Sequence, residues 1–296
     1  MTRNLNLQVC GANLFLLEKW DPSSSLSDDD QLVQVFSSFI QLPFTQRYVY
    51  TKRIKDQGLR KFTDLPQADQ DLLSRLRKPE ELQCVDTIWL RTCYDDGSDA
   101  AFSAFMKEHG PSESDYPVFE DACRYNYGGG DGWRRIFTRL PQFLSPHDMS
   151  PEEYEAEKQK ALEECFEDEQ QDIEEVKEQG GVQEEDGTYW GQLYSLWHYT
   201  TQVGMIFVID EKTLRVAAED PRSAKVLAVW FDEMGRVVRQ KRMSEHETWC
   251  VEGLKTGLGE GAFMESGMWV TAKPGEDYDW EGPLGPPALI GEEFDS

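Results

Sequence analysis

Apolar residues in the first third of the chain recur mainly at helical spacing. From Leu32 to Ile40 they fall on one face of a helix, and Pro43 is expected to end it. The segment from Gln67 to Leu76 has the same spacing and predicts a second helix, with Asp64 as its cap.

Two segments of the same region alternate instead, as is typical of strands. Leu5 to Trp20 predicts a strand followed by a mixed segment. Arg47 to Arg53 carries Tyr48 and Tyr50 on one face, and it predicts a short strand in one of the few locally basic places.

A strand–helix unit comes next. Val85 to Leu90 is rich in apolar residues and predicts a buried strand. Ser98 is the expected N-cap of the following helix, which should stop at Gly110. Val118 and Phe119 predict the start of another short strand.

The last third is dominated by strand patterns. Met205 to Ile209 and Val226 to Phe231 predict buried strands, and a turn at Asp232 to Gly235 joins the second of them to Arg236 to Arg242. We expect those last two strands to form a hairpin. Shorter strands are expected at Trp249–Val251 and Met268–Val270.

Between these regions lies a long charged segment. Ser150, Pro151 and Glu153 form a strong helix start, and the helix is expected to run to Gln179. From Asp148 to Asp186 the chain has seventeen acidic residues and three lysines, which account for fourteen of its 26 net negative charges. The sparse apolar residues form one narrow stripe, so the helix should dock along one edge.

Together these patterns predict an α/β or α+β fold: a mixed sheet with flanking helices and one long inserted acidic helix. We expect residues 1–80 to form a helical and strand extension packed on the core. Residues 81–272 form the core domain with the insertion at 148–186. Residues 273–296, rich in Pro, Gly and acidic residues, are expected to be a flexible tail.

Composition narrows the class of protein. With 296 residues the chain can bury a core without staples, and its six cysteines form no C-x-x-C pair or zinc-spaced cluster. No signal peptide or membrane span is evident, so a cytoplasmic protein is expected. The negative charge disfavours nucleic acid and anionic lipid, and it favours a basic protein or cationic ligand. No cofactor or metal is expected.

The first candidate site is Asp95 and Asp96 with Arg91, directly after the predicted strand. Ligands of α/β sheets bind at the carboxyl ends of strands, and paired carboxylates could act as acid and base. The alternative, which we favour, is a capped turn built from Asp, Gly and Ser.

A second candidate is the loop Gly128 to Gly132, followed by Arg134 and Arg135. Its backbone N–H groups could hold an anion with help from the arginines. The chain contains no phosphate-binding glycine motif, so a plain surface loop is the favoured alternative.

A third candidate is His198 among Trp190, Tyr194 and Trp197. Such a group could form an aromatic pocket for a small molecule or a cation, although plain core packing is the favoured alternative. His246 with Cys250 is a weaker pair, while His109 and His147 are expected at the surface.

One stretch resembles a known family. The run from Asp86 to Phe102 resembles the opening of an actinobacterial domain family of unknown function, in which a strand, an Arg-Thr step and an Asp-Asp pair precede a helix. Ile206–Asp210, Val226–Val229 and Gly235–Arg239 are also similar. The resemblance spans about residues 85–270, departs at the acidic insertion, and implies an α/β fold with Asp95, Asp96 and Asp210 as positions of interest.

These observations predict a non-catalytic binding or interaction protein that uses its acidic helix towards a basic partner. The alternative is a small-molecule enzyme, for example in an accessory biosynthetic step, with Asp95, Asp96, Asp210 or His198 near its pocket. No catalytic sequence signature supports a particular reaction.

Overall fold

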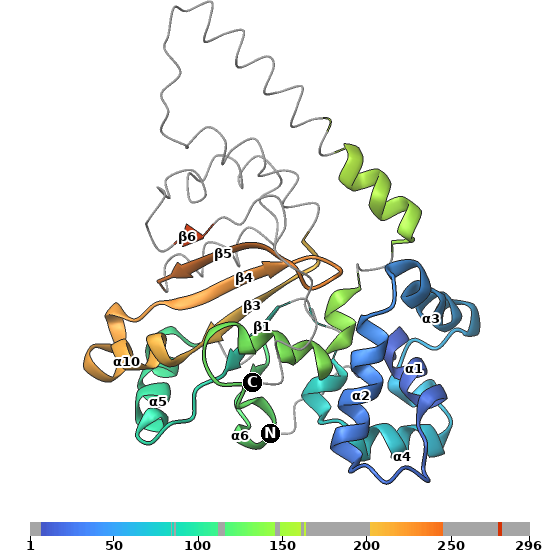
Figure 1. The fold of residues 1–296 in the computed structure, drawn as a ribbon, viewed down its shortest axis with the longest axis horizontal. Helices are drawn as coiled ribbons and strands as arrows, with labels where there is room; N and C mark the ends of the chain where they lie inside the picture. The colour runs from blue at the N-terminus through green and yellow to red at the C-terminus, as the bar shows by residue number, and fades with distance from the viewer. Residues whose placement is uncertain are drawn as a thin grey trace, which may run out of the picture.

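In the described part of the chain, six strands form a mixed sheet in the order β2-β1-β3-β4-β5-β6 (Figure 1). This computed structural model describes residues 7–83, 85, 87–111, 116–145, 149–160, 163, 202–244 and 278–279. The strands are β1 (Thr87–Arg91), β2 (Val118–Phe119), β3 (Gly204–Ile209), β4 (Val226–Phe231), β5 (Val237–Met243) and β6 (Tyr278–Asp279).

The sheet is parallel on one side and antiparallel on the other. β1 runs parallel to both β2 and β3, whereas β3, β4, β5 and β6 alternate in direction. The predicted mixed sheet with flanking helices is therefore confirmed, as is the β4–β5 hairpin. Its turn is closed by the Asp232 carboxylate, which accepts the N–H groups of Met234 at 2.9 Å and Arg236 at 2.8 Å.

Alternate residues of the central strands face two separate cores, because successive side chains of a strand point to opposite faces. On one face, Trp89 and Phe207 pack with α5 (Ser98–His109) and α10 (Glu211–Glu219). On the other face, Leu90 and Val208 pack in a cluster that includes residues of the N-terminal helices.

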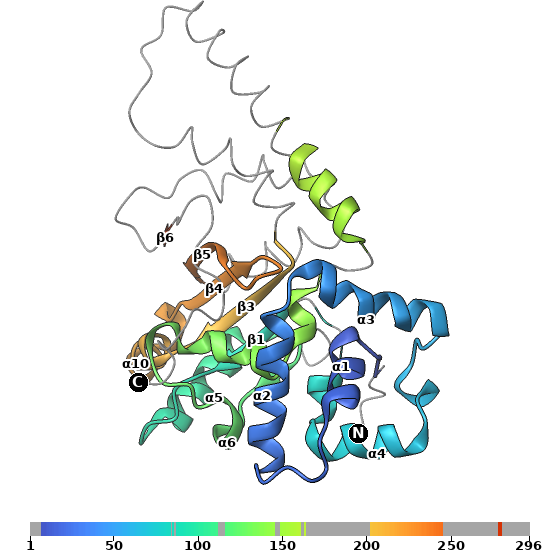
Figure 2. The ribbon, with the colours of Figure 1, turned by 45° about the vertical axis from the view of Figure 1, so that its right-hand side comes forward.

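The N-terminal helices gather on one side of the molecule, away from α5 and α10 (Figure 2). They are α1 (Gly11–Lys19), α2 (Asp28–Ile40), α3 (Phe44–Gln57) and α4 (Gln67–Leu76), with the 3-10 turns η1 (Phe62–Asp64) and η2 (Pro79–Leu82). α2 and α4 follow their predicted patterns. Asp64, however, belongs to η1 and accepts the N–H groups of Arg60 and Lys61, so it does not cap α4.

One strand prediction in this region is wrong, and of another only a single bridge is seen among the described residues. Arg47 to Arg53 lies inside helix α3, whose buried residues Arg47 and Ile54 are about two helical turns apart. The strand was predicted because Tyr48 and Tyr50 are two residues apart, which is also the spacing of residues on one face of a strand. In the segment Leu5 to Trp20, the described residues make an isolated bridge at Gln8 and then helix α1.

The remaining short elements connect β2 to the acidic segment. They are α6 (Ala122–Tyr125), η3 (Gly130–Thr138) and η4 (Pro141–Leu144), while η5 (Pro221–Ser223) follows α10. α2 packs against both η3 and η4, which joins the N-terminal helices to the body of the protein.

The acidic segment begins as predicted. Residues 151–160 are helical, and Ser150 and Glu153 form the capping box: the Glu153 N–H donates to the Ser150 hydroxyl at 3.2 Å, and the Ser150 N–H donates to the Glu153 carboxylate at 2.7 Å. Of the predicted continuation to Gln179, only residue 163 is described, and it is helical. The strands expected at 249–251 and 268–270 lie outside the described residues.

Candidate functional site

The carboxyl ends of β1 and β3 meet at one edge of the sheet. Arg91 is in register with Ile209, and the Thr92 N–H donates to the Ile209 carbonyl oxygen at 3.1 Å. This places Asp210 beside the segment that carries Asp95 and Asp96. The structure thus brings the first set of predicted site residues to a common edge.

Arg91 connects the end of β1 to the loop after it and to the start of α5. Its buried guanidinium donates to the Cys93 carbonyl at 2.9 Å, the Ser98 hydroxyl at 2.8 Å and the Asp99 carboxylate at 2.6 Å. It also contacts two aromatic rings, those of Tyr94 (4.5 Å) and Phe102 (4.6 Å). These contacts fix the loop onto α5.

Ser98 is not the N-cap of α5, contrary to the sequence-based expectation. Gly97 takes that position with a φ of +85°, a conformation that suits glycine, and Ser98 is the first helical residue. The Ser98 hydroxyl is used by Arg91 instead of by the helix backbone.

Asp210 has a clear structural role as the N-cap of α10. Its carboxylate accepts the N–H and the hydroxyl of Thr213, both at 2.9 Å, and forms an ion pair with Arg242. Burial alone would raise its pKa, but the bonds from Arg242 and Thr213 outweigh burial and leave the pKa below its ordinary value. Asp210 is therefore an ionised, well-satisfied carboxylate.

Asp95 and Asp96 are both exposed and do not form a closed pair. The Asp95 carboxylate lies 3.6 Å from the Cys93 sulfur. Burial, reinforced by the charge of Asp95, raises the pKa of the Cys93 thiol, so it stays protonated at neutral pH. The edge thus offers exposed carboxylates to solvent, but its cysteine is a poor nucleophile.

The glycine-rich loop is explained by its backbone. Gly128 and Gly130 have φ angles of +74° and +61°, and a Cβ on Gly132 would lie 2.2 Å from the Tyr127 carbonyl oxygen. The two arginines after it have different surroundings. Arg134 is buried with its guanidinium 5.6 Å from the Trp133 ring.

Arg135 is exposed instead, and its guanidinium lies 5.8 Å from the Tyr127 ring. The two guanidinium groups therefore do not share one environment, as a joint anion site would require. The plain structural alternative fits this loop better.

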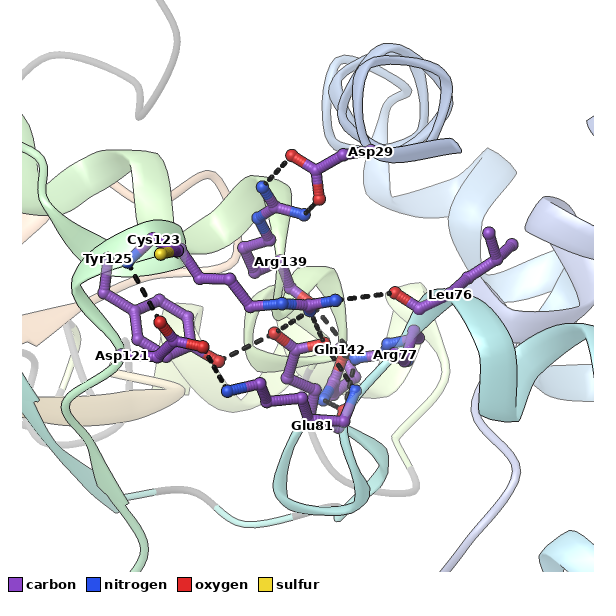
Figure 3. Close-up of polar contacts among 11 residues, drawn as sticks. Asp29, Leu76, Arg77, Glu81, Asp121, Cys123, Tyr125, Arg139 and Gln142 are labelled. Carbon is purple, nitrogen blue, oxygen red and sulfur yellow. Dashed lines mark hydrogen bonds and ion pairs between the residues drawn. The ribbon is translucent and has the colours of Figure 1, made fainter. Parts of the chain in front are cut away.

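Sequence reasoning missed a buried polar cluster around Glu81, shown in Figure 3. The Glu81 carboxylate is fully buried and accepts hydrogen bonds from Arg124 to both oxygens at 2.8 Å, from Tyr125 at 2.7 Å and from the Lys78 N–H at 3.0 Å. A buried carboxylate needs such partners.

The same cluster extends to the N-terminal helices. Arg77 donates to the side chain of Asn13 on α1 at 2.5 Å. It also donates to Gln142 at 3.1 Å, and Arg139 forms a two-bond ion pair with Asp29 on α2 (Figure 3). The cluster therefore connects α1 and α2 to η2, α6, η3 and η4. No local sequence signal reveals it, because its members are spread over more than a hundred residues.

The first two turns of the acidic helix, which we call its root, are fixed to the β4–β5 turn and to α3. Tyr154 is only 2% exposed, and its hydroxyl donates to the Glu233 carboxylate at 2.9 Å. Its ring packs edge-on against Phe44 of α3 at 5.7 Å. Lys158 lies 3.4 Å from Glu233 and 2.7 Å from Glu155.

Below this root, Arg47 joins three parts of the chain. It is fully buried and donates to the carbonyl oxygens of Leu42 at 3.1 Å, Leu144 at 2.6 Å and Glu233 at 2.5 Å. Burial lowers the pKa of Arg47 to about 10, opposed by the charges of Glu233 and Asp232, so it is charged at neutral pH. The hairpin turn that receives the acidic helix is thereby held in place.

The outer side of the helix carries a row of exposed carboxylates, which we name the acidic ridge. Its members are Glu152, Glu153, Glu155, Glu157 and Glu163. In Figures 1 and 2 the yellow-green helix of residues 151–160 stands beside α3 at the margin of the described structure. The ridge therefore faces solvent while its root is buried.

Several predicted residues lie outside the described part of the chain, so their arrangement stays a prediction. They are His147, Trp190, Tyr194, Trp197, His198, His246 and Cys250. His109 is described, and the expectation that it lies at the surface is wrong. It is 7% exposed, and its Nε2 contacts the Pro221 carbonyl oxygen where α5 meets η5.

The described ranges hold neither a metal-binding cluster nor a membrane-spanning helix. These residues contain no group of three or more His, Cys, Asp or Glu side chains placed to hold a metal ion. None of the helices described here has the length and apolar character needed to cross a bilayer.

Comparisons with known proteins give no family for this chain. No protein-family model matches it, and neither curated proteins nor solved structures match it. The resemblance to an actinobacterial domain family therefore stays a prediction.

Proposed function

We propose that this chain is a non-catalytic binding protein that presents its acidic ridge to a basic protein segment. One observation carries the proposal: five exposed glutamates lie on a helix whose root is fixed by Tyr154 and Lys158 to Glu233. A fixed array of like charges is pre-organised for an oppositely charged partner, so less ordering is needed on binding.

The polar groups at the carboxyl ends of β1 and β3 support binding over catalysis. Asp210, which the enzyme alternative would use, is already held by Thr213 of α10 and Arg242 of β5, and the ligand-binding candidate Arg91 is held by contacts with α5. The proposal includes no cofactor. Cys93 and Cys123 carry thiols that form no disulfide, which is in keeping with a cytoplasmic location, and that location also belongs to the proposal.

The test uses a fluorescent lysine-rich peptide as the basic probe. Replacing Glu152, Glu157 and Glu163 with glutamine leaves the capping residue Glu153 intact. Because each exposed charge contributes a few tenths to one kcal/mol, we expect the affinity to fall about tenfold. Binding by the unaltered protein should weaken steeply as salt is raised.

The matched control removes the same number of charges elsewhere. Glu120, Glu211 and Glu219 are also exposed, and they lie outside the acidic ridge. Their glutamine variant should bind the peptide as the unaltered protein does. If both triple variants lose affinity equally, the peptide responds only to total charge, and the proposed site is wrong.

A further inference from the structure

α3 and the loop after it carry the opposite charge to the rest of the chain. Between residues 44 and 61, five cationic side chains are exposed and Asp56 is the exposed acidic residue. We name these five the basic strip: Lys52, Arg53, Lys55, Arg60 and Lys61. In a chain of net charge -26, a local excess of this kind needs an explanation.

The basic strip and the acidic ridge adjoin where α3 passes the first turn of the acidic helix. Phe44 at the start of α3 packs on Tyr154, and in both views the lower end of the acidic helix lies next to α3, from which the helix then rises away (Figures 1 and 2). The pKa of Glu153 is lowered, mainly by its bonds from Ser150 and to a smaller extent by the charge of Lys55. One surface therefore has a positive half next to a negative half.

Exposed apolar residues occur on the same two elements. Within the described ranges three large hydrophobic side chains are exposed, and two of them are Val49 on α3 (54%) and Met149 directly before the acidic helix (39%). Apolar residues of this kind, rimmed by charge, are typical of protein–protein contacts.

We propose that a second copy of the chain occupies this surface, with the acidic ridge of each protomer on the basic strip of its partner. A two-fold axis brings a patch onto itself, so it requires a surface that is self-complementary. The acidic ridge, with five glutamates, and the basic strip, with five cationic side chains, form such a surface. In one dimer the contact between ridge and strip would therefore occur twice. The inference rests on the proposed function, because it names the partner of the same ridge.

The test changes Lys52 and Lys55 and leaves Arg53, whose guanidinium lies 2.8 Å from the Glu18 carboxylate, unaltered. Self-association of the full chain is measured by sedimentation velocity. The unaltered protein should dimerise at about 50 mM salt and dissociate near 1 M, where the Debye length falls to about 3 Å. The Lys52→Glu/Lys55→Glu variant and the Glu152→Lys/Glu157→Lys variant should each associate at least about tenfold more weakly.

Mixing these two variants provides the decisive result. In the mixed dimer every contact again joins opposite charges, so association should be restored. The matched controls are Lys107→Glu/Lys212→Glu and Glu211→Lys/Glu219→Lys on α5 and α10, which should dimerise normally. Failure of the mixture to associate, or loss of association in the controls, overturns the inference.

Failure of the dimer can be told apart from failure of the proposed function. A chain that is monomeric at low salt, but whose acidic ridge still binds the lysine-rich peptide, retains the proposed function and loses the second copy as its partner. A chain that neither associates nor binds the peptide contradicts both.

Discussion

A buried arginine such as Arg47 is costly unless each of its three guanidinium nitrogens finds an acceptor. Three carbonyl oxygens from three separate segments supply them here. Arg47 therefore connects these three segments, although nothing in the neighbouring sequence indicates that it is buried.

We expect Arg47→Met to lower the free energy of unfolding by about 3 to 5 kcal/mol, because it leaves buried carbonyl groups without donors. Urea unfolding at neutral pH measures the change. Arg53→Met is the control on the same helix: its ion pair with Glu18 is largely exposed, and its loss should cost under about 1 kcal/mol. Equal losses would contradict the assigned role of Arg47.

Asp210→Asn should cost roughly 2 kcal/mol at neutral pH, because it removes the charge that pairs with Arg242. The folded-state pKa of Asp210 is lowered, so its contribution is complete above the ordinary aspartate pKa of about 4 and is lost as pH falls through the lower folded value. The difference between the two proteins should thus shrink in acid.

The control for this measurement is Asp96→Asn, at an exposed position on the same edge of the sheet. It should change the free energy of unfolding at neutral pH by less than about 0.5 kcal/mol. A pH-independent difference between Asp210→Asn and the unaltered protein would show that its ion pair is not what stabilises the edge.

At the scale of elements, Tyr154 decides how firmly the acidic helix is held. Tyr154→Ala removes both the bond to Glu233 and the ring contact with Phe44. We expect the amide hydrogens of residues 151–160 to exchange at least about tenfold faster, because local opening then costs less. Gln159→Ala on the exposed side should leave exchange unchanged; a similar increase there would contradict anchoring by Tyr154.

Elements with unambiguous spacing could be predicted from the sequence. α4, β3 and the β4–β5 hairpin follow from apolar periodicity and turn residues, and the capping box at Ser150 follows from four consecutive residues. α3 could not, because its buried face includes Arg47, a residue that carries no apolar signal. The partners of Glu81 could not either, since only the fold brings them together.

For the whole molecule, the cluster around Glu81 governs how the N-terminal helices attach to the sheet. Glu81→Gln should lower the free energy of unfolding by about 3 kcal/mol, because Arg124 would lose its buried counter-charge. Thermal unfolding measures the loss. Glu80→Gln, at a less buried neighbour, is the control, and a comparable decrease there would contradict the importance of the buried pair.

The parallel pairing of β1 with β3 has a consequence for how the chain folds. Leu90 and Val208 are partners although more than a hundred residues separate them. Such distant pairing is slow, because the loop must close before its contacts can form. During synthesis, β1 can therefore pair only with the two-residue β2 until the last third of the chain has left the ribosome. A chain truncated before residue 204 should expose the unpaired edge of β1, which makes aggregation more likely.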